Sequence, residues 1–214
     1  MVRSTARRMN LARRRPPADP RQEERGAQRI LRAARRLFVR AGGAGFSARG
    51  VAKEAGVSLG AVQHFFPSKD ALLAATLEHV LAEFRRAYER LQEELPFSAE
   101  SRLLGVVDLL VADVWRRDSR KFFLGLHALS CHNRFAERLL GAMCAHHQRR
   151  LAGFIGAARP HLTEQQCLDL ALQLCAMIDG LMIYTGPCSR TIRPPARLAG
   201  VIKRSALRLL APPP

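Results

Sequence analysis

The chain has little of what a secreted or membrane protein needs. Its five cysteines are an odd set without a Cys-x-x-Cys pair, which argues against a disulfide framework and favours a reducing cytoplasm. No apolar segment follows the Arg-rich start, so we expect no secretory signal. The most apolar stretch, 168–184, is interrupted by Asp169, Gln173 and Asp179 and is too polar to span a bilayer. We therefore expect a cytoplasmic protein without membrane contacts.

Recognisable catalytic motifs are also absent from the sequence. It contains no Gly-rich phosphate loop, no nucleophile elbow and no carboxylate pair at catalytic spacing. Isolated histidines do not make an active site. A helical enzyme with a basic tail is thus the least supported class, and we expect neither catalytic residues nor a cofactor.

Aromatic residues make up only 6% of the 214 residues, whereas alanine, leucine and arginine are abundant. This composition favours helix over sheet, and a hydrophobic content of 48% is enough for a real core. The formal net charge is +17. Such a charge attracts polyanions, with nucleic acid first and acidic membranes second. Charge alone does not separate a sequence-specific reader from a nonspecific binder.

The N-terminal segment, residues 1–22, combines clustered arginines with Pro16, Pro17 and Pro20. It has little apolar surface to bury, so we expect it to be disordered when free. Two interpretations stay open. The segment is either a solvated tail or an arm that follows DNA phosphates or enters a minor groove.

Two short helices follow a longer one in the next part of the chain. Apolar spacing predicts a helix over 23–41, which Gly42, Gly43 and Gly45 then end. Ser47 is a good N-cap for a second helix, Gly56 suits a turn with positive φ, and Ser58 caps a third helix that reaches about Phe65. Two short helices joined by a tight turn on a longer first helix predict a helix-turn-helix.

The remainder of the chain also reads as helical. Ser68 caps a long fourth helix that continues to Pro96, and Thr163 to Gln166 form a capping box. No convincing strand alternation appears, so the predicted fold is all-α. Further helices are expected at 99–116, 119–131, 134–159, 164–185 and 195–210.

Four segments, 29–38, 46–47, 51–60 and 65–73, together resemble the DNA-binding domain of the TetR family of transcriptional regulators. The resemblance covers residues 25–81 and agrees in residue type, order and spacing. Beyond Leu81 it is one of architecture only. It implies a helix-turn-helix domain at 23–70, a helical ligand-binding and dimerisation domain at 71–214, and a homodimer that places the third helix of each subunit in the DNA major groove.

Carried over by position, the resemblance implies a DNA-contacting set. Ser47 and Lys69 would each hold a phosphate at a helix start. Gly60 would allow close backbone approach, and Gln63 or His64 would hydrogen-bond base edges. The family usually has Tyr where this chain has Gln63, which changes the type of contact. Phe65 is expected to help close the core of the head. The remaining members of the reading face are Arg49, Ser58 and Leu59.

The resemblance also places a dimer seam on the last two helices. About half of its candidates are expected to belong to the subunit's own core, because helical apolar stripes face the core by default. The candidates are Leu170, Leu174, Met177, Ile178, Leu181, Leu198, Val201, Ile202 and Leu209.

A mostly apolar cavity with a few polar groups is expected in the C-terminal domain, suited to a small hydrophobic or aromatic effector. Its predicted lining residues are Trp115, Phe123, His127, Cys131, Met143 and His147, with His132, Cys144 and His146 nearby. Metal binding by the His and Cys residues, or thiol sensing by Cys131 or Cys144, is a weaker alternative.

Three aspartates lie in otherwise apolar helices. If Asp108 or Asp113 points inward, a cationic ligand becomes more attractive, whereas Asp179 is expected to be structural or capping. The sequence as a whole predicts a ligand-responsive repressor acting as a homodimer on palindromic operator DNA. The alternative is a nonspecific nucleic-acid compaction protein, whose binding would be indifferent to sequence and steeply salt-dependent.

Overall fold

The computed structural model describes residues 20–94, 98–184 and 195–209, and the Arg-rich segment before residue 20 lies outside them. These described residues are helical almost throughout and contain no strand. The elements are α1 (Pro20–Gly45), α2 (Ala48–Ala55), α3 (Leu59–Phe65), α4 (Lys69–Glu94), α5 (Ala99–Trp115), α6 (Arg117–Ser130), α7 (Arg134–Ala158), α8 (Glu164–Tyr184) and α9 (Pro195–Leu209). The all-α prediction is confirmed.

Local capping chemistry sets the helix boundaries. The Oγ atoms of Ser47, Ser58 and Ser68 accept hydrogen bonds from the backbone N–H groups three residues on, at 3.0–3.1 Å. The predicted capping box at α8 forms as well: Gln166 N–H donates to Thr163 Oγ1 at 3.2 Å, and Thr163 N–H donates to Gln166 Oε1 at 2.8 Å. Each bond satisfies a donor that the first turn of a helix leaves free.

The first helix differs from its prediction at both ends. It begins at Pro20, so Arg21 and Gln22 are helical rather than part of a disordered arm. Proline is well suited to a helix start because it has no N–H to leave unpaired. At the other end, Gly42 takes a φ of 63° inside the assigned span, a left-handed conformation that glycine adopts without steric cost. The glycines therefore redirect the chain toward α2, as the sequence indicates.

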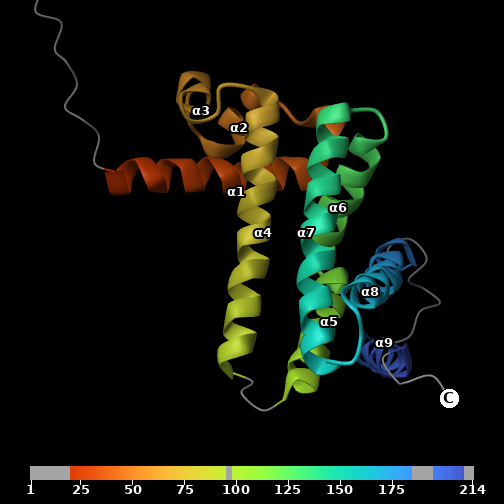
Figure 1. Cartoon of the computed structure of the whole chain (residues 1–214). Coiled ribbons are helices and arrows are strands. Elements are labelled where there is room, and N and C mark those ends of the chain that lie inside the picture. Colours follow the sequence, from red (N-terminus) through yellow and green to blue (C-terminus); the bar gives the residue numbers. More distant parts are fainter. Residues whose placement is uncertain (1–19, 95–97, 185–194, 210–214) are drawn as a thin grey trace, which may run out of the picture.

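The helices form a small head and a larger body (Figure 1). In the head, α2 and α3 sit on α1, and α4 leaves the head and extends along the body. In the view of Figure 1, α4 and α7 stand side by side, while α8 and α9 lie on the opposite side of α7 from α4. Because α4 belongs to both parts, it is the mechanical link between them.

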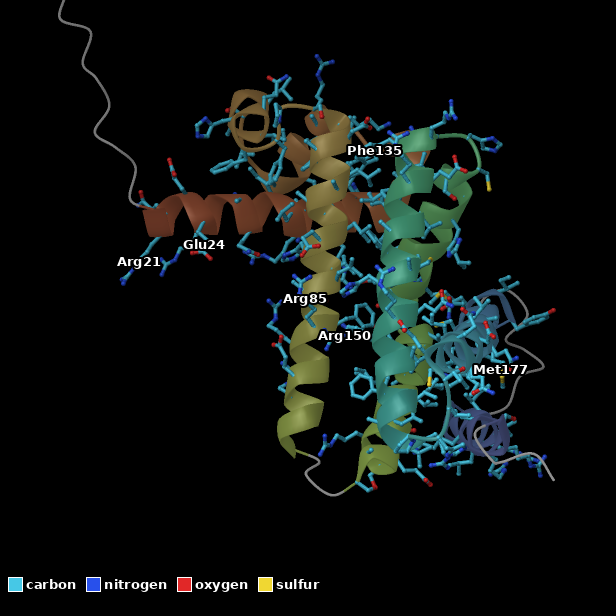
Figure 2. The ribbon with its side chains drawn as sticks, viewed as in Figure 1. Arg21, Glu24, Arg85, Phe135, Arg150 and Met177 are labelled. Carbon is cyan, nitrogen blue, oxygen red and sulfur yellow. The ribbon has the colours of Figure 1, made fainter. Side chains whose placement is uncertain are left out.

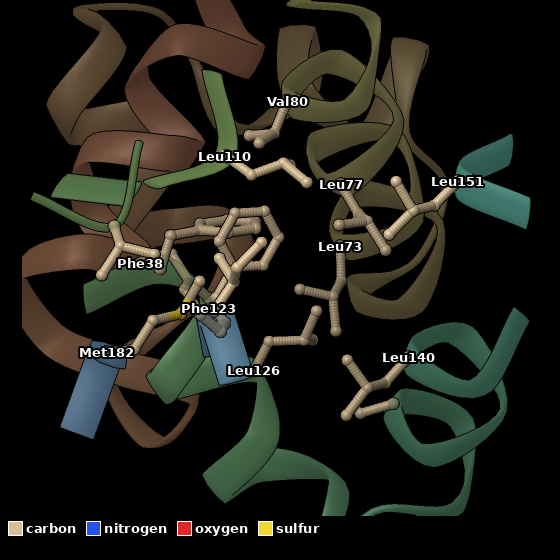
Figure 3. Close-up of a cluster of buried hydrophobic side chains, with 14 of the residues drawn as sticks. Phe38, Leu73, Leu77, Val80, Leu110, Phe123, Leu126, Leu140, Leu151 and Met182 are labelled. Carbon is tan, nitrogen blue, oxygen red and sulfur yellow. The ribbon is translucent and has the colours of Figure 1, made fainter. Parts of the chain in front are cut away.

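One continuous apolar core joins head and body. It contains Phe38 of α1, Leu73 and Leu77 of α4, Leu126 of α6 and Leu151 of α7, each under 7% exposed (Figure 3). A row of aromatic rings runs through this core, with centroid separations of 5.1–6.0 Å between neighbours: Phe46, Phe38, Phe122, Phe123 and Phe84. Such close, tilted contacts resist sliding of one helix on another.

Candidate functional site

Gly56 forms the turn between α2 and α3 of the helix-turn-helix. Its φ of 63° and ψ of 42° are left-handed, and its N–H donates to the carbonyls of Ala52 and Lys53 at the end of α2. Val51, Ala52 and Val62 are buried beneath the turn, so α2 and α3 are fixed against α1 by a small apolar core. The motif predicted from the sequence is present.

The predicted DNA-contacting residues share the exposed surface of this head. Gln63 and His64 of α3 are exposed, as is Arg49 of α2, whereas Leu59 is half-buried. At Gly60 a Cβ would meet nothing nearer than Ser58 Oγ, at 3.9 Å. This part of α3 therefore presents bare backbone and two hydrogen-bonding side chains to solvent, the combination that major-groove readout requires.

Helix starts supply further donors. Ser47 and Ser58 are exposed N-caps whose oxygens accept backbone N–H groups, which leaves each hydroxyl hydrogen free to donate outward. Lys69 is exposed at the start of α4, with Nζ 3.5 Å from the carbonyl oxygen of Gly43. The ammonium group has three hydrogens, so this contact leaves donors for a phosphate.

Phe65 is partly buried and packs against the apolar core, in agreement with the expectation that it helps to close the core of the head. Its ring lies along α1, where a Cβ on Gly26 would be 3.4 Å from Cζ, and it packs edge-on against His64 at a centroid separation of 5.1 Å. The ring therefore lies between the core and the first turns of α1. Phe65 thereby braces His64 on α3.

Basic side chains surround the head, and some of them pair with nearby carboxylates. Glu54 of α2 pairs with Arg36 at 3.0 Å and Arg40 at 2.8 Å. Their hydrogen bonds hold the pKa of Glu54 below its usual range. Arg29 donates to the carbonyl of Gly56 at 3.4 Å. These contacts tie α2 and the turn to α1 and leave the positive field of the head largely intact.

A cavity of about 470 Å³ lies in the body, walled by α4, α5, α6, α7 and α8. The predicted residues Phe123, His127, Met143 and His147 all line it, together with Cys144 and His146. Most of its wall is apolar, including Leu77, Leu81 and Phe84 of α4, which the sequence reasoning missed. The sequence shows that Leu77 and Phe84 lie on the apolar face of α4. It does not show which residues of that face line the cavity and which pack in the core, because that depends on the neighbouring helices.

Two predicted pocket residues lie elsewhere. Cys131 is exposed in the turn after α6, with Sγ 3.4 Å from the carbonyl oxygen of His127. Trp115 ends α5, packs partly against the core and buries its Nε1 without a hydrogen-bond partner among the described residues. Both are helix-end residues, so they lie beyond the part of each helix that faces the cavity. His132 is likewise exposed and outside the lining.

Asp113 and Asp108 of α5 point in different directions. Asp113 is 8% exposed and lines the cavity, where its Oδ1 accepts the Ser119 hydroxyl at 2.8 Å and lies 3.9 Å from Arg116 Nη1. Desolvation raises its pKa in spite of these partners. Asp108 instead pairs with Lys203 of α9 on the outside. Asp113 is therefore the inward-pointing aspartate that would make a cationic ligand more attractive.

Asp179 does not have the capping role, one of the two roles expected of it from the sequence. It caps nothing, because α8 continues beyond it to Tyr184, and it lines the cavity. Desolvation raises its pKa, an effect that nearby His127 partly opposes. Asp179 is exposed, and its carboxylate has no hydrogen bond or ion pair within the described ranges.

The pKa values of Cys144, His147 and Cys175 in the cavity are all shifted toward the uncharged form. Burial raises the pKa of Cys144 and raises that of Cys175 to about 12, so neither is a reactive thiolate at neutral pH. Burial also lowers the pKa of His147. Across the described part of the chain, no three His, Cys, Asp or Glu side chains are grouped to hold a metal ion.

The predicted seam divides into inward and outward residues. Leu174, Ile178 and Ile202 are buried within the subunit and so belong to its own core. Leu170, Met177 and Leu181 are half-buried, Val201 is 41% exposed, and the side chains of Leu198 and Leu209 lie outside the described residues. Ile183 and Tyr184, each 60% exposed, are outward apolar residues that the prediction omitted.

Helix α8 is unusually apolar for its length. By length and composition it is the one described helix that reaches the threshold for a membrane span, yet it packs against α7 and only 28% of its most apolar window is buried. It carries Asp169, Gln173 and Asp179. A helix this apolar and this little covered is equally suited to pairing with another protein surface.

Comparison with known proteins supports the helix-turn-helix in the head. The family described as "Bacterial regulatory proteins, tetR family" matches residues 30–76, which contain α2, α3 and the turn at Gly56. The HTH-type transcriptional regulator BetI of Escherichia coli is 31% identical over 135 residues, covering 62% of this chain and 68% of BetI. The chain belongs to the TetR family. It is therefore a DNA-binding transcriptional regulator with a helix-turn-helix.

Solved structures extend the TetR fold to the body. A transcriptional regulator from Pseudomonas aeruginosa PAO1 superposes with a TM-score of 0.73 at 21% identity, over 91% of this chain and 93% of that one. A transcriptional regulator from Saccharomonospora viridis in complex with choline gives a TM-score of 0.64 at 24% identity, over 87% and 96%. At these identities the similarity establishes the fold, so the body shares the architecture of TetR-family regulators.

Proposed function

We propose that this TetR-family regulator is a ligand-responsive repressor that binds a palindromic operator as a homodimer. The observation that carries the proposal is the double role of α4. Its first residue, Lys69, is exposed on the head and is one of the proposed phosphate contacts. Further along the same helix, Leu77, Leu81 and Phe84 form one wall of the cavity. A ligand that moves this wall moves the head.

The homodimer rests on the outward apolar residues of the last two helices. Ile183, Tyr184 and Val201 expose apolar surface that a single subunit does not cover. Pairing of this surface with the same surface of a second copy would cover it in a closed twofold dimer, the commonest symmetric assembly. A twofold axis places two α3 helices about 34–36 Å apart, one turn of DNA, and matches a palindromic operator.

The effector is proposed to occupy the cavity. A volume of about 470 Å³ with a mainly apolar wall suits a small hydrophobic or aromatic molecule. The choline complex of the S. viridis regulator supports a small-molecule role for this type of body. Release of DNA follows only if the ligand binds better to a state in which the two heads are wrongly spaced.

The test begins with DNA from the intergenic region upstream of the protein's own gene. Footprinting at physiological salt against scrambled competitor should protect a palindrome. Gln63→Ala and His64→Ala should each cost about 1–3 kcal/mol of discrimination at the bases they contact. Both side chains are exposed, so helicity by circular dichroism should not change.

His161→Ala provides a matched control, because His161 is exposed in the turn between α7 and α8, away from the head. The nonspecific compaction alternative is favoured by the +17 charge. It predicts equal affinity for operator and scrambled DNA, with no loss in the Gln63 and His64 variants. That result would replace the repressor proposal.

A further inference from the structure

The charged groups of the cavity wall are unequally partnered. On α4, Glu78 and Arg85 pair with each other at 2.6 Å, so their charges cancel locally. On α5, Asp113 is held by Ser119. On α8, Asp179 lines the cavity and has no hydrogen bond or ion pair in the described part of the chain. The carboxylate of Asp179 therefore lines the cavity without a hydrogen-bond or ion-pair partner among the described residues.

A carboxylate without a hydrogen bond or ion pair in a mainly apolar cavity is unfavourable, because its charge has lost part of its hydration and nearby His127 opposes that loss only in part. The raised pKa of Asp179 reports the same imbalance. A positively charged occupant would restore the missing interaction. An anionic occupant would add like-charge repulsion, and a neutral one would leave the carboxylate further desolvated.

Aromatic rings stand in the same cavity. Phe84 of α4 and Phe123 of α6 both line it, with ring centroids 6.0 Å apart and planes inclined by 55°. Phe123 lies one helical turn before His127, the residue whose charge acts on Asp179. Ring faces attract organic cations, by about 0.5–2 kcal/mol depending on desolvation. The carboxylate and the rings thus favour the same charge type.

The basic groups of the wall come from other helices. Figure 2 shows Arg85 and Arg150 between α4 and α7, whereas Asp179 is on α8. Arg85 is already paired with Glu78, and burial lowers the pKa of His147, which keeps that imidazole uncharged at neutral pH. The whole chain carries a net charge of +17, which repels a cation, so any attraction must come from groups close to the cavity. Added salt screens the distant positive charge and should therefore not weaken cation binding strongly.

We propose that the cavity binds a small organic cation with an apolar or aromatic body, its charge beside Asp179 and its body against Phe84 and Phe123. This assignment rests on the proposed effector role of the cavity. It narrows the ligand class from any small hydrophobic molecule to a cationic one. Asp113, on the α5 wall of the same cavity, already contacts Ser119 and Arg116.

Calorimetric titration at pH 7.5 with three probes of similar shape tests the charge preference. The probes are 2-phenylethylammonium, neutral 2-phenylethanol and anionic 3-phenylpropionate. The cation should bind at least tenfold more tightly than either of the others. Equal or tighter binding of the alcohol or the anion, or no binding of the cation at millimolar concentration, would overturn the proposal.

Two variants on one helix locate the charge. Asp179→Asn keeps the shape of the side chain and should remove most of the tenfold preference. Asp169→Asn is the matched control, because Asp169 is exposed on α8, outside the cavity, where it accepts a hydrogen bond from Gln165 at 2.9 Å. It should bind the cation as the unaltered protein does. An unchanged preference in Asp179→Asn contradicts the assignment.

Operator footprinting in the presence of each probe separates this proposal from the repressor proposal. If the cation binds selectively but never weakens operator binding, the cavity assignment stands and induction by this ligand class fails. If a neutral or anionic compound releases the operator while the cation does not bind, the repressor proposal stands and the cation assignment fails.

Discussion

Phe38 of α1 and Phe122 of α6 lie with their ring centroids 5.1 Å apart and their planes inclined by 52°. Both side chains are at most 1% exposed. This contact joins a helix of the DNA-binding head to a helix of the cavity wall. It is the middle of the aromatic row from Phe46, beside the N-cap of α2, to Phe84 in the cavity.

The Phe38–Phe122 contact should show direct energetic coupling. In a double-mutant cycle with Phe38→Leu and Phe122→Leu, we expect an interaction free energy of about 0.5–1.5 kcal/mol, because the ring pair contributes beyond the area it buries. Urea unfolding measures it. Strict additivity of the two substitutions would show that the rings pack independently and would remove the physical basis of the row.

Two glycines of the head should respond in opposite ways to alanine. Gly56→Ala places a Cβ at a φ of 63°, which should lower the free energy of unfolding by about 1–2 kcal/mol. Gly60→Ala is the matched control. Its Cβ has open space within α3, so stability should rise by about 0.5–1 kcal/mol.

Operator affinity should fall in Gly60→Ala in spite of the gain in stability, because the added methyl group stands between α3 and the groove. Chemical denaturation and operator titration check the two quantities separately. Unchanged operator affinity in this variant would indicate that Gly60 does not approach the DNA.

Asp113 should give the stability of the protein a specific pH dependence. Burial raises its folded-state pKa above the ordinary aspartate value of 3.8, so the folded state favours the protonated form. Stability from this group is present at low pH and is lost as the pH rises through the folded pKa. Asp113→Asn should therefore unfold at a higher temperature than the unaltered protein at pH 7.5.

The stability difference between Asp113→Asn and the unaltered protein should shrink as the pH is lowered toward 3.8 and below. Thermal unfolding at a series of pH values measures it. Asp118→Asn, at an exposed position in the first turn of α6, is the control for a surface carboxylate. A difference that stayed constant across the series would mean that desolvation of Asp113 is unimportant.

The exposed end of α8 should control association. Ile183→Asp introduces a charge where the side chain is 60% exposed, so the isolated subunit should keep its fold and its helicity. If the surface pairs with a second copy, the buried charge costs several kcal/mol per interface, and sedimentation should shift from dimer to monomer. Leu172→Asp tests whether the effect is local, since Leu172 is 57% exposed on the same helix but lines the cavity. An unaltered dimer in Ile183→Asp would place the interface elsewhere.

The sequence by itself determined the elements that depend on local chemistry. The caps at Ser47, Ser58 and Ser68 and the left-handed turn at Gly56 could be predicted because each needs only a few neighbouring residues. The helix-turn-helix followed from these caps and this turn. The exposure of Gln63 and His64 on α3 agrees with the reading face that the family resemblance implies. The start of α1 at Pro20 was missed, since an Arg-rich run has no apolar periodicity to mark it.

Tertiary structure decided which face of each body helix meets the cavity. Asp113 and Asp179 turn toward it and Asp108 turns away, although all three lie in apolar helices. Leu174 and Ile202 turn inward while Val201 stays exposed. A periodic stripe shows that a helix has a buried side, but several neighbours share that side in the body. Only the packed arrangement, in which each helix is rotated and shifted against the others, fixes whether a side chain meets core, void or solvent.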